Sequence, residues 1–391
     1  MTAITSGCGG SYTAESTTPV TDASSDGTTA DGTTTDAAAE ANACGADLRI
    51  DPKNCGRCGH DCLGGACSSG KCDALHLGET GGRLSRVMRS GAYVLTSSVL
   101  RQSTETGGLW RVPVSGGVTE LYVPLVHAEG FAVLGDLLYF AVDELPVDGA
   151  DNHGGLYSCP LVGPAPCTPT LIASADRPVD VTADQGRVFY TDRANGDALM
   201  VYTAPGPPTV FRAAGAAPFS VATNVHVEGA AAFLTAVGYV GLKQAARLWE
   251  VLPDGGAIEL YSYTSPSAST GRLFATPDMF VFSAFDFTAT TGGVVRRIPR
   301  KGGGLCDLGG TTNVRPYGVH ADASRVYWTN QGVGSALPYN NGSVVSCVQA
   351  GCCTTPEVLW KGPVQPTGLT GDDEALYFVT YAGSIWKVAK P

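Results

Sequence analysis

The sequence has little positive charge and no long hydrophobic run. Its 25 Lys and Arg residues face 36 Asp and Glu, which gives a formal net charge of −11, and the first 48 residues contain no Lys or Arg. Nucleic acid is therefore not expected as a partner, because phosphate binding requires a basic face. A membrane-spanning helix needs about 20 apolar residues. The longest apolar run, Ala230 to Leu242, is interrupted by Thr235 and two glycines, so the body of the chain is expected to be soluble.

Long helices are not expected either. The chain contains 51 Gly and 24 Pro, which interrupt helices and form turns. At the same time, 43% of the residues are hydrophobic and only 16% are charged, so a large core can form. The composition thus predicts an all-β protein with many turns.

A short pattern of strand, turn and strand recurs along the chain. It reads PYGVHADASRVYWTN at Pro316 to Asn330, DVTADQGRVFYTD at Asp180 to Asp192 and PTGLTGDDEALYFVT at Pro366 to Thr380. The Val, Phe, Tyr and Trp residues favour half-buried strands, and Gly186 suits the positive φ of a tight hairpin. The pattern predicts a repeat protein.

The repeats can be counted by their second strand. Successive copies lie 44 to 50 residues apart, and most are followed by a third strand and a short fourth strand. Four strands per period of about 45 residues is typical of a β-propeller blade. The sequence therefore predicts a seven-bladed β-propeller of four-stranded antiparallel blades. The second strands contain Tyr93–Leu95, Leu138–Phe140, Val188–Tyr190, Ala232–Leu234, Phe280–Phe282, Val326–Trp328 and Leu376–Phe378.

The seventh unit ends at Pro391 with only three strands, which would leave an open sheet edge. The segment Asp73 to Gly78, before the first blade, has the pattern of a fourth strand. We expect it to pair with Ser384 to Val388 and to close the ring. The propeller would then cover residues 73–391.

Two repeats, VYWTN at Val326 to Asn330 and VFYTD at Val188 to Asp192, resemble the YWTD repeat of extracellular propellers. The resemblance concerns blade construction and implies nothing about the partner. YWTD propellers have six blades, whereas seven units are counted here.

Thirteen cysteines are too many for a reducing compartment unless they bind metal, so disulfides and an extracytoplasmic location are predicted. Six of them lie in residues 44–72, a segment too small and too poor in apolar residues to fold without cross-links. Three disulfides are expected there, with the connectivity open. The alternative is a zinc site at Cys55, Cys58 and His60, because Cys-x2-Cys is metal-ligand spacing. The six cysteines are Cys44, Cys55, Cys58, Cys62, Cys67 and Cys72.

The run from Asp51 to Cys62, DPKNCGRCGHDC, and the closing Gly70 and Cys72 resemble the stigma-specific cysteine-rich family. Similar modules precede propellers in predicted bacterial lipoproteins. The resemblance covers only residues 44–72, and it implies an extracytoplasmic location more than an activity.

Cysteines also recur within the blades. The offset that aligns the second strands of blades 2 and 6 carries Cys159 onto Cys347 in the third strands, each with another cysteine a few residues later across the hairpin. Hairpin disulfides are expected, together with one link between neighbouring blades. The predicted pairs are Cys159 with Cys167, Cys347 with Cys352 or Cys353, and Cys306 with whichever of the last two remains.

The segment Thr5 to Cys8 resembles the end of a bacterial lipobox, in which small residues precede a lipidated cysteine. Thr5 stands where Leu is usual, and residues 1–7 lack a basic region and an apolar core. Either the natural start lies upstream and Cys8 is lipidated, or Cys8 is an ordinary thiol. Residues 9–43 have almost nothing to bury and are expected to be a flexible linker, so residues 1–43 would form a tether.

The most acidic loop of the ring, residues 143–154, places oxygen ligands on a Gly-containing segment, which suits Ca²⁺. The loop has no EF-hand spacing. Calcium is a candidate ligand there, and no other cofactor is predicted. The carboxylates are Asp143, Glu144, Asp148 and Asp151.

Propeller enzymes such as the streptogramin lyases and gluconolactonases hold a metal or a general base at one mouth of the ring. Here His127, His226 and His320 lie on or near inner strands, but no ring of ligands emerges and no catalytic residue is predicted. The sequence therefore favours a monomeric binding or scaffolding module for an unknown protein or glycan, on the cell surface or in the periplasm, with membrane contact only through a lipid anchor. A propeller lyase or hydrolase is the alternative.

Overall fold

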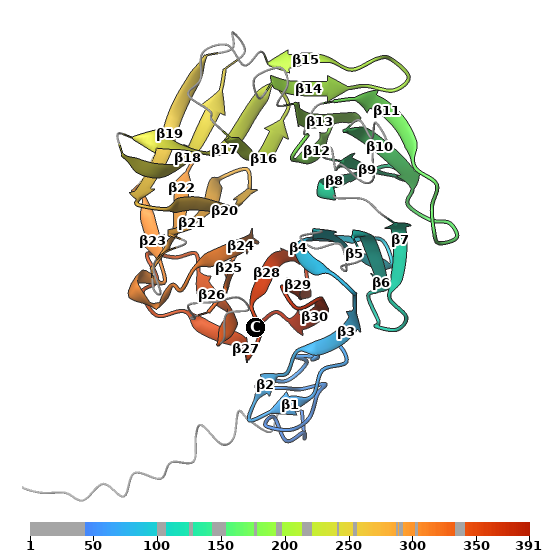
Figure 1. Cartoon of the computed structure of the whole chain (residues 1–391). Helices are drawn as coiled ribbons and strands as arrows, with labels where there is room; N and C mark the ends of the chain where they lie inside the picture. Colours follow the sequence, from blue (N-terminus) through green and yellow to red (C-terminus); the bar gives the residue numbers. More distant parts are fainter. Residues whose placement is uncertain are drawn as a thin grey trace, which may run out of the picture.

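Seven four-stranded antiparallel sheets form the blades of a ring in the described part of the chain, and a small two-stranded sheet lies outside it (Figure 1). This arrangement confirms the predicted seven-bladed β-propeller. The computed structural model describes residues 44–99, 107–124, 128–142, 154–175, 178–192, 198–212, 221–240, 242–252, 256–286, 288, 292–301, 304–332 and 341–391.

Each blade begins with an inner strand and ends with an outer strand at the rim. The inner strands contact those of the neighbouring blades, so together they surround the centre of the ring (Figure 1). The blades are, in order: β4 (Arg83–Ser90), β5 (Tyr93–Val99), β6 (Gly108–Pro113), β7 (Glu120–Pro124); β8 (Ala128–Leu134), β9 (Leu137–Val142), β10 (Gly155–Pro160), β11 (Thr170–Ser174); β12 (Val181–Asp184), β13 (Arg187–Asp192), β14 (Ala198–Tyr202), β15 (Thr209–Arg212); β16 (Val221–Glu228), β17 (Ala231–Val240), β18 (Lys243–Val251), β19 (Ala257–Ser265); β20 (Ala268–Ala275), β21 (Met279–Asp286), β22 (Val294–Pro299), β23 (Cys306–Leu308); β24 (Pro316–Ala321), β25 (Arg325–Asn330), β26 (Gly342–Val348), β27 (Glu357–Gly362); and β28 (Pro366–Gly371), β29 (Ala375–Thr380), β30 (Ser384–Ala389), β3 (Leu75–Glu79).

The last blade is completed by a strand from the start of the propeller. Strand β3 pairs antiparallel with β30, placing Leu75 opposite Lys387 and Glu79 opposite Ser384. The side chain of Leu77 in β3 is only 2% exposed, because it packs into the core between blades 7 and 1. The first and last blades are therefore joined by backbone hydrogen bonds and by shared core contacts.

The hydroxyl residue that follows the apolar triplet of some second strands has a defined role. In blades 5 and 6 the inner strand carries a bulge, and a hydroxyl of the second strand accepts a hydrogen bond from a backbone N–H at the bulge. In blade 6, Thr329 Oγ1 accepts from the Gly318 N–H at 2.8 Å and donates to the Thr367 carbonyl of blade 7 at 2.9 Å. Thr329 is fully buried, so its hydroxyl provides the hydrogen bond that the buried Gly318 N–H needs, and it also links blade 6 to blade 7.

The cysteine-rich module contains β1 (Cys67–Ser68) and β2 (Lys71–Cys72) and lies below blade 7 in Figure 1. Its half-cystines pack against Ala389 of the propeller. Of the ring nitrogens of His60, Nδ1 lies 2.6 Å from the Cys55 carbonyl and Nε2 lies 2.8 Å from the Lys390 carbonyl. The module is thus attached to the same blade that its following strand completes.

Helix is almost absent from the described ranges, whose one helix is the 3₁₀ turn η1 (Gly310–Thr312). None of the helical structure there has the length and apolar character needed to cross a membrane.

Candidate functional site

One position on the inner strand is equivalent in all seven blades. In six blades it lies one residue before the inner-strand residue that pairs with the last residue of the second-strand triplet, such as Val319 opposite Trp328 in blade 6. In blade 1 the pairing is shifted by one residue, and the equivalent position precedes Val87, which pairs with Thr96. We call these seven residues the channel ring. From blade 1 to blade 7 they are Arg86, Gly130, Asp180, Asn224, Arg272, Gly318 and Gly368.

The glycines of the channel ring allow neighbouring inner strands to approach closely. A Cβ atom on Gly130 would lie 2.5 Å from the Cα atom of Asp180, and one on Gly318 would lie 2.5 Å from the Thr367 carbonyl oxygen. Blades 2 and 6 therefore cannot place a side chain at this level without moving their neighbours. The side chains that remain are charged or polar.

Arg86 and Asp180 form an ion pair between blades 1 and 3. Arg86 Nη2 also donates to the Val181 carbonyl at 3.1 Å. The Asp180 side chain is buried, and its Oδ1 and Oδ2 accept backbone N–H groups of Val181 at 3.0 Å and Val225 at 2.8 Å. This carboxylate consequently holds together the inner strands of three blades.

Arg272 reaches across the ring from blade 5. Its Nη1 donates to Asn224 Oδ1 at 2.8 Å, and its Nη2 lies 3.4 Å from the carbonyl oxygen of Ser85 in blade 1. The guanidinium lies over the Tyr317 ring, with the guanidinium carbon 5.6 Å from the ring centroid. Arg272 thus contacts blades 4, 6 and 1, and the two acceptors of its hydrogen bonds within the described residues are neutral.

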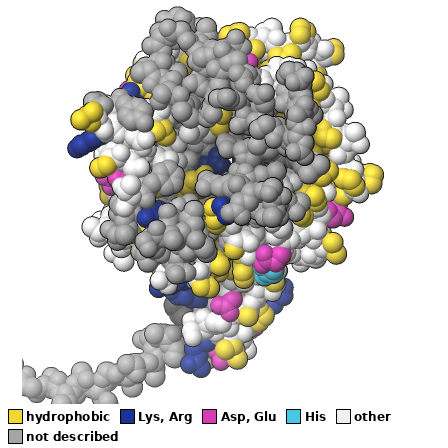
Figure 2. Space-filling view, viewed as in Figure 1, with side chains coloured by type: hydrophobic (Ala, Val, Ile, Leu, Met, Phe, Trp, Pro, Cys, Tyr) yellow, Lys and Arg dark blue, Asp and Glu magenta, His cyan; other side chains and the backbone are white. Residues whose placement is uncertain are grey.

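The two guanidiniums influence each other. Burial, together with the positive charge of Arg272, lowers the pKa of Arg86 to about 9. Arg86 still remains cationic near neutral pH. Figure 2 shows Lys or Arg side chains inside the hollow at the middle of the ring. The chemistry available to a molecule on the ring axis is therefore that of hydrogen-bond donors carrying positive charge.

Carboxylates four residues after the channel ring are bonded to the next blade. In blade 3, Asp184 Oδ2 accepts the Gly229 N–H at 2.8 Å, and in blade 6, Asp322 accepts from Lys390 Nζ at 2.8 Å. Burial alone would raise the pKa of Asp322, but hydrogen bonds from Lys390 and from Ser324 outweigh it and hold the pKa well below its usual range. These carboxylates lie in the hairpins between first and second strands, and they act as links between blades.

The two candidate histidines that the structure describes, His226 and His320, pack against aromatic side chains and do not form a common site. His320 is 7% exposed and lies edge-on to Phe274, with ring centroids 4.6 Å apart. Burial and the charge of Lys390 lower the pKa of His320 to about 4. His226 occupies the equivalent position in blade 4, beside Phe233, and burial lowers its pKa as well. His127 lies outside the described residues, so it cannot be placed relative to these two.

Several other predicted sites also fall outside the described ranges. Cys8, the lipidation candidate, is one of them, as is the linker up to residue 43. The calcium candidates also belong to this group, namely Asp143, Glu144, Asp148 and Asp151.

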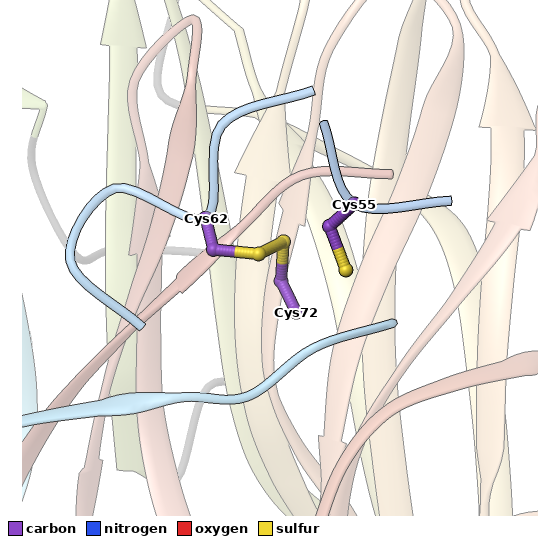
Figure 3. A group of neighbouring side chains, drawn as sticks. All are labelled: Cys55, Cys62 and Cys72. Atoms are coloured by element: carbon purple, nitrogen blue, oxygen red, sulfur yellow. A yellow bond between two sulfur atoms is a disulfide. The ribbon is translucent and has the colours of Figure 1, made fainter. Parts of the chain in front are cut away.

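The zinc alternative in the cysteine-rich module is wrong, because its cysteines are oxidised. Within the described residues, the one group of three or more metal-type ligands is Cys55, Cys62 and Cys72, and Figure 3 shows the sulfur–sulfur bond from Cys62 to Cys72. Cys55 is bonded to Cys67. The third bond of the module is Cys44–Cys58, so both cysteines of the predicted zinc site lack a free thiolate.

Three further disulfides lie within the propeller. Cys159 pairs with Cys167 within blade 2, as the offset between blades predicted. The ambiguity in blade 6 is resolved as Cys347–Cys353 and Cys306–Cys352. The last bond joins β23 of blade 5 to the β26–β27 hairpin of blade 6. Six disulfides indicate an oxidising, extracytoplasmic environment.

Sequence reasoning missed the channel ring. When the inner strands are aligned at His320, Thr182 and Thr370 occupy the equivalent positions, and these residue types do not form a catalytic or metal-binding set. Two residues earlier the repeat alignment reaches Arg272 in blade 5 but Ser85 in blade 1, so it finds Arg272 and misses Arg86 by one residue. It could not show that these two side chains turn into the same channel.

Comparisons with known proteins extend the description of the fold. No family model and no curated protein matches the sequence. Virginiamycin B lyase from Staphylococcus aureus is similar in structure, with TM-score 0.56 and 14% identity over 82% of this chain and 99% of that chain. A catalytically inactive variant of the same lyase with quinupristin gives TM-score 0.52 and 13% identity over 82% and 99% of the two chains. The WD40 propeller domain of Doa1 gives TM-score 0.52 and 10% identity over 82% and 97%. At these identities the chain shares with them a propeller fold and nothing more specific.

Proposed function

We propose that this propeller is an extracytoplasmic binding module whose ligand contacts the ring at its central channel. The observation that supports it best is Arg272, which reaches over the ring axis with neutral hydrogen-bond partners from two other blades. A cationic donor held by several rigid strands is suited to recognition of a polar ligand. The partner in this proposal is a protein or a glycan, and the module acts as a monomer.

The alternative, a propeller lyase or lactonase, receives less support from the described geometry. A general base must lie within hydrogen-bond reach of the proton that it removes. His320 is instead enclosed by Phe274, Tyr327 and Gly371, and a Cβ atom on Gly371 would lie 2.7 Å from its Nε2. This histidine therefore fits a packing role better than proton transfer.

A lipid anchor at Cys8 belongs to the same proposal. Small residues precede this cysteine, and a polar segment of the length expected for a tether separates it from the cysteine-rich module. The disulfides of that module fit display outside the cytoplasm.

The experiment compares binding with turnover. The full-length, oxidised chain is applied to glycan and peptide arrays, with reduced and alkylated chain as the control. We expect saturable binding that the control loses. In parallel, quinupristin and gluconolactone are incubated with the chain and divalent metal, and we expect no turnover. Turnover abolished by His320→Phe, in the absence of array binding, would replace this proposal with the enzyme alternative.

A further inference from the structure

We propose that the central channel contains a binding site for an oxyanion, namely a carboxylate or phosphate group, centred on Arg272 and bordered by Arg86. This inference deepens the proposed binding function, on which it rests, by naming the chemical group that the channel recognises. It concerns a small, defined site whose occupancy can be measured without the natural partner.

The first argument is the balance of charge at the channel ring. Two guanidiniums lie at this level, from blades 1 and 5, and one carboxylate, Asp180, lies there in blade 3. Asp180 is paired with Arg86, and its oxygens also accept the backbone N–H groups of Val181 and Val225. Within the described residues, this carboxylate is thus committed to Arg86, and one positive charge of the channel ring is left without a counter-ion.

The second argument is the hydrogen bonding of Arg272. A guanidinium has five N–H donors in a planar fork. Asn224 Oδ1 and the Ser85 carbonyl accept from two of them in the described part of the chain, at 2.8 and 3.4 Å. The Ser85 contact is long for a hydrogen bond. An oxyanion that accepts two parallel N–H bonds would replace this weak neutral contact with a charge-assisted pair.

The third argument is the setting of the two cations. Arg272 Nη2 lies near the carbonyl oxygen of Ser85, the residue next to Arg86, and the two guanidiniums are close enough for the charge of Arg272 to lower the pKa of Arg86. Phe131 and Tyr317 flank them, with guanidinium carbons 5.6 Å from each ring centroid. A cleft lined by charges of one sign focuses the electric field, so an anion near two cations there is attracted more strongly than on an open surface.

A purely structural role explains Arg86 but not Arg272. Arg86 has a buried carboxylate partner, so it serves as a link between blades 1 and 3. The hydrogen bonds of Arg272 to Asn224 and Ser85 need N–H donors but no charge, and the Tyr317 ring attracts the guanidinium without neutralising it. Within the described residues, no contact of Arg272 supplies the negative charge that would balance its own.

The test is calorimetric titration of the full-length, oxidised chain at low ionic strength. The probes are inorganic phosphate and succinate, with glycerol as a neutral control. Arg272→Gln keeps a hydrogen-bond donor for Asn224 but removes the charge. Arg296→Gln is the matched control, because Arg296 lies in the same blade and is paired with Asp307 on the outer side. Urea unfolding of both variants shows whether each is folded.

We expect saturable binding of at least one probe by the natural chain and by Arg296→Gln, and binding at least about tenfold weaker in Arg272→Gln. Binding of phosphate alone assigns a phosphate ligand, and binding of succinate alone assigns a carboxylate ligand. Absence of binding by either probe, or equal affinity in folded Arg272→Gln, would overturn the site. Array binding by the natural chain that persists in Arg272→Gln would retain the binding function and reject this site, so the two failures can be distinguished.

Discussion

At the scale of single residues, His320 shows how the propeller uses a titratable group as a core residue. The ring is buried beside Phe274 and Tyr327, and its pKa lies near 4 because burial, and then the charge of Lys390, disfavour the imidazolium. In the unfolded chain an ordinary histidine has a pKa near 6.5. The folded state consequently binds fewer protons than the unfolded state between these two values, and the stability is lost as the pH falls through this window.

We predict that His320→Phe reduces the acid sensitivity of the fold. Between pH 7.5 and pH 5 the natural chain should lose about 2 kcal/mol of unfolding free energy that the variant retains. Urea unfolding at a series of pH values measures the difference. The pKa of His226 is also lowered by burial, so the remaining slope should shrink further in the double variant with His226→Phe. Parallel pH profiles for His320→Phe and the natural chain would contradict the prediction.

At the scale of elements, the disulfides within and between blades differ in the length of chain that they close. Cys306 and Cys352 lie 46 residues apart and join blades 5 and 6, whereas Cys159 and Cys167 lie 8 residues apart in one hairpin. Each bond joins a well buried cysteine to a more exposed one, so the packing lost on removal is comparable. A longer loop costs the unfolded chain more entropy when it is closed.

Replacing both cysteines of the Cys306–Cys352 bond with alanine should therefore destabilise the protein more than the same change at Cys159–Cys167. The expected difference is about 1.5 kcal/mol from loop entropy. Denaturant unfolding of the two double variants, side by side, gives the comparison. An equal loss would show that strain or residual structure outweighs chain entropy at these sites.

At the scale of the whole molecule, stability depends on closure of the ring by β3. Leu77 is 2% exposed and packs between blades 7 and 1. Leu77→Ala should cost about 2–5 kcal/mol, because it leaves a cavity at the seam. Hydrogen exchange of the β30 amides, Ser384 to Ala389, should accelerate at the same time. Leu171→Ala is the control, since Leu171 lies on the outer strand of blade 2 and is 51% exposed. Similar losses in both variants would argue against a special role for closure.

Much of this architecture was readable in the sequence because it repeats. Short apolar triplets such as Val326–Trp328 recur at a nearly constant period, and burial of one sheet face against the next makes that period visible in the residue types. The same periodicity predicted the partner of Cys159. The third strand of the last blade, β30, would have an unpaired edge without a strand from elsewhere in the chain, and β3 pairs with that edge.

The sequence by itself determined the class, the number of blades and the presence of disulfides, because these follow from local pattern and composition. Only the tertiary structure decided which cysteine of Cys352 and Cys353 meets Cys306, and that His60 contacts the propeller instead of a metal. It also brought Arg86 and Arg272, 186 positions apart in the chain, to one channel. Such pairings depend on how the ring curves and on which side chain reaches across it, and neither of these is encoded in the spacing of residues along a strand.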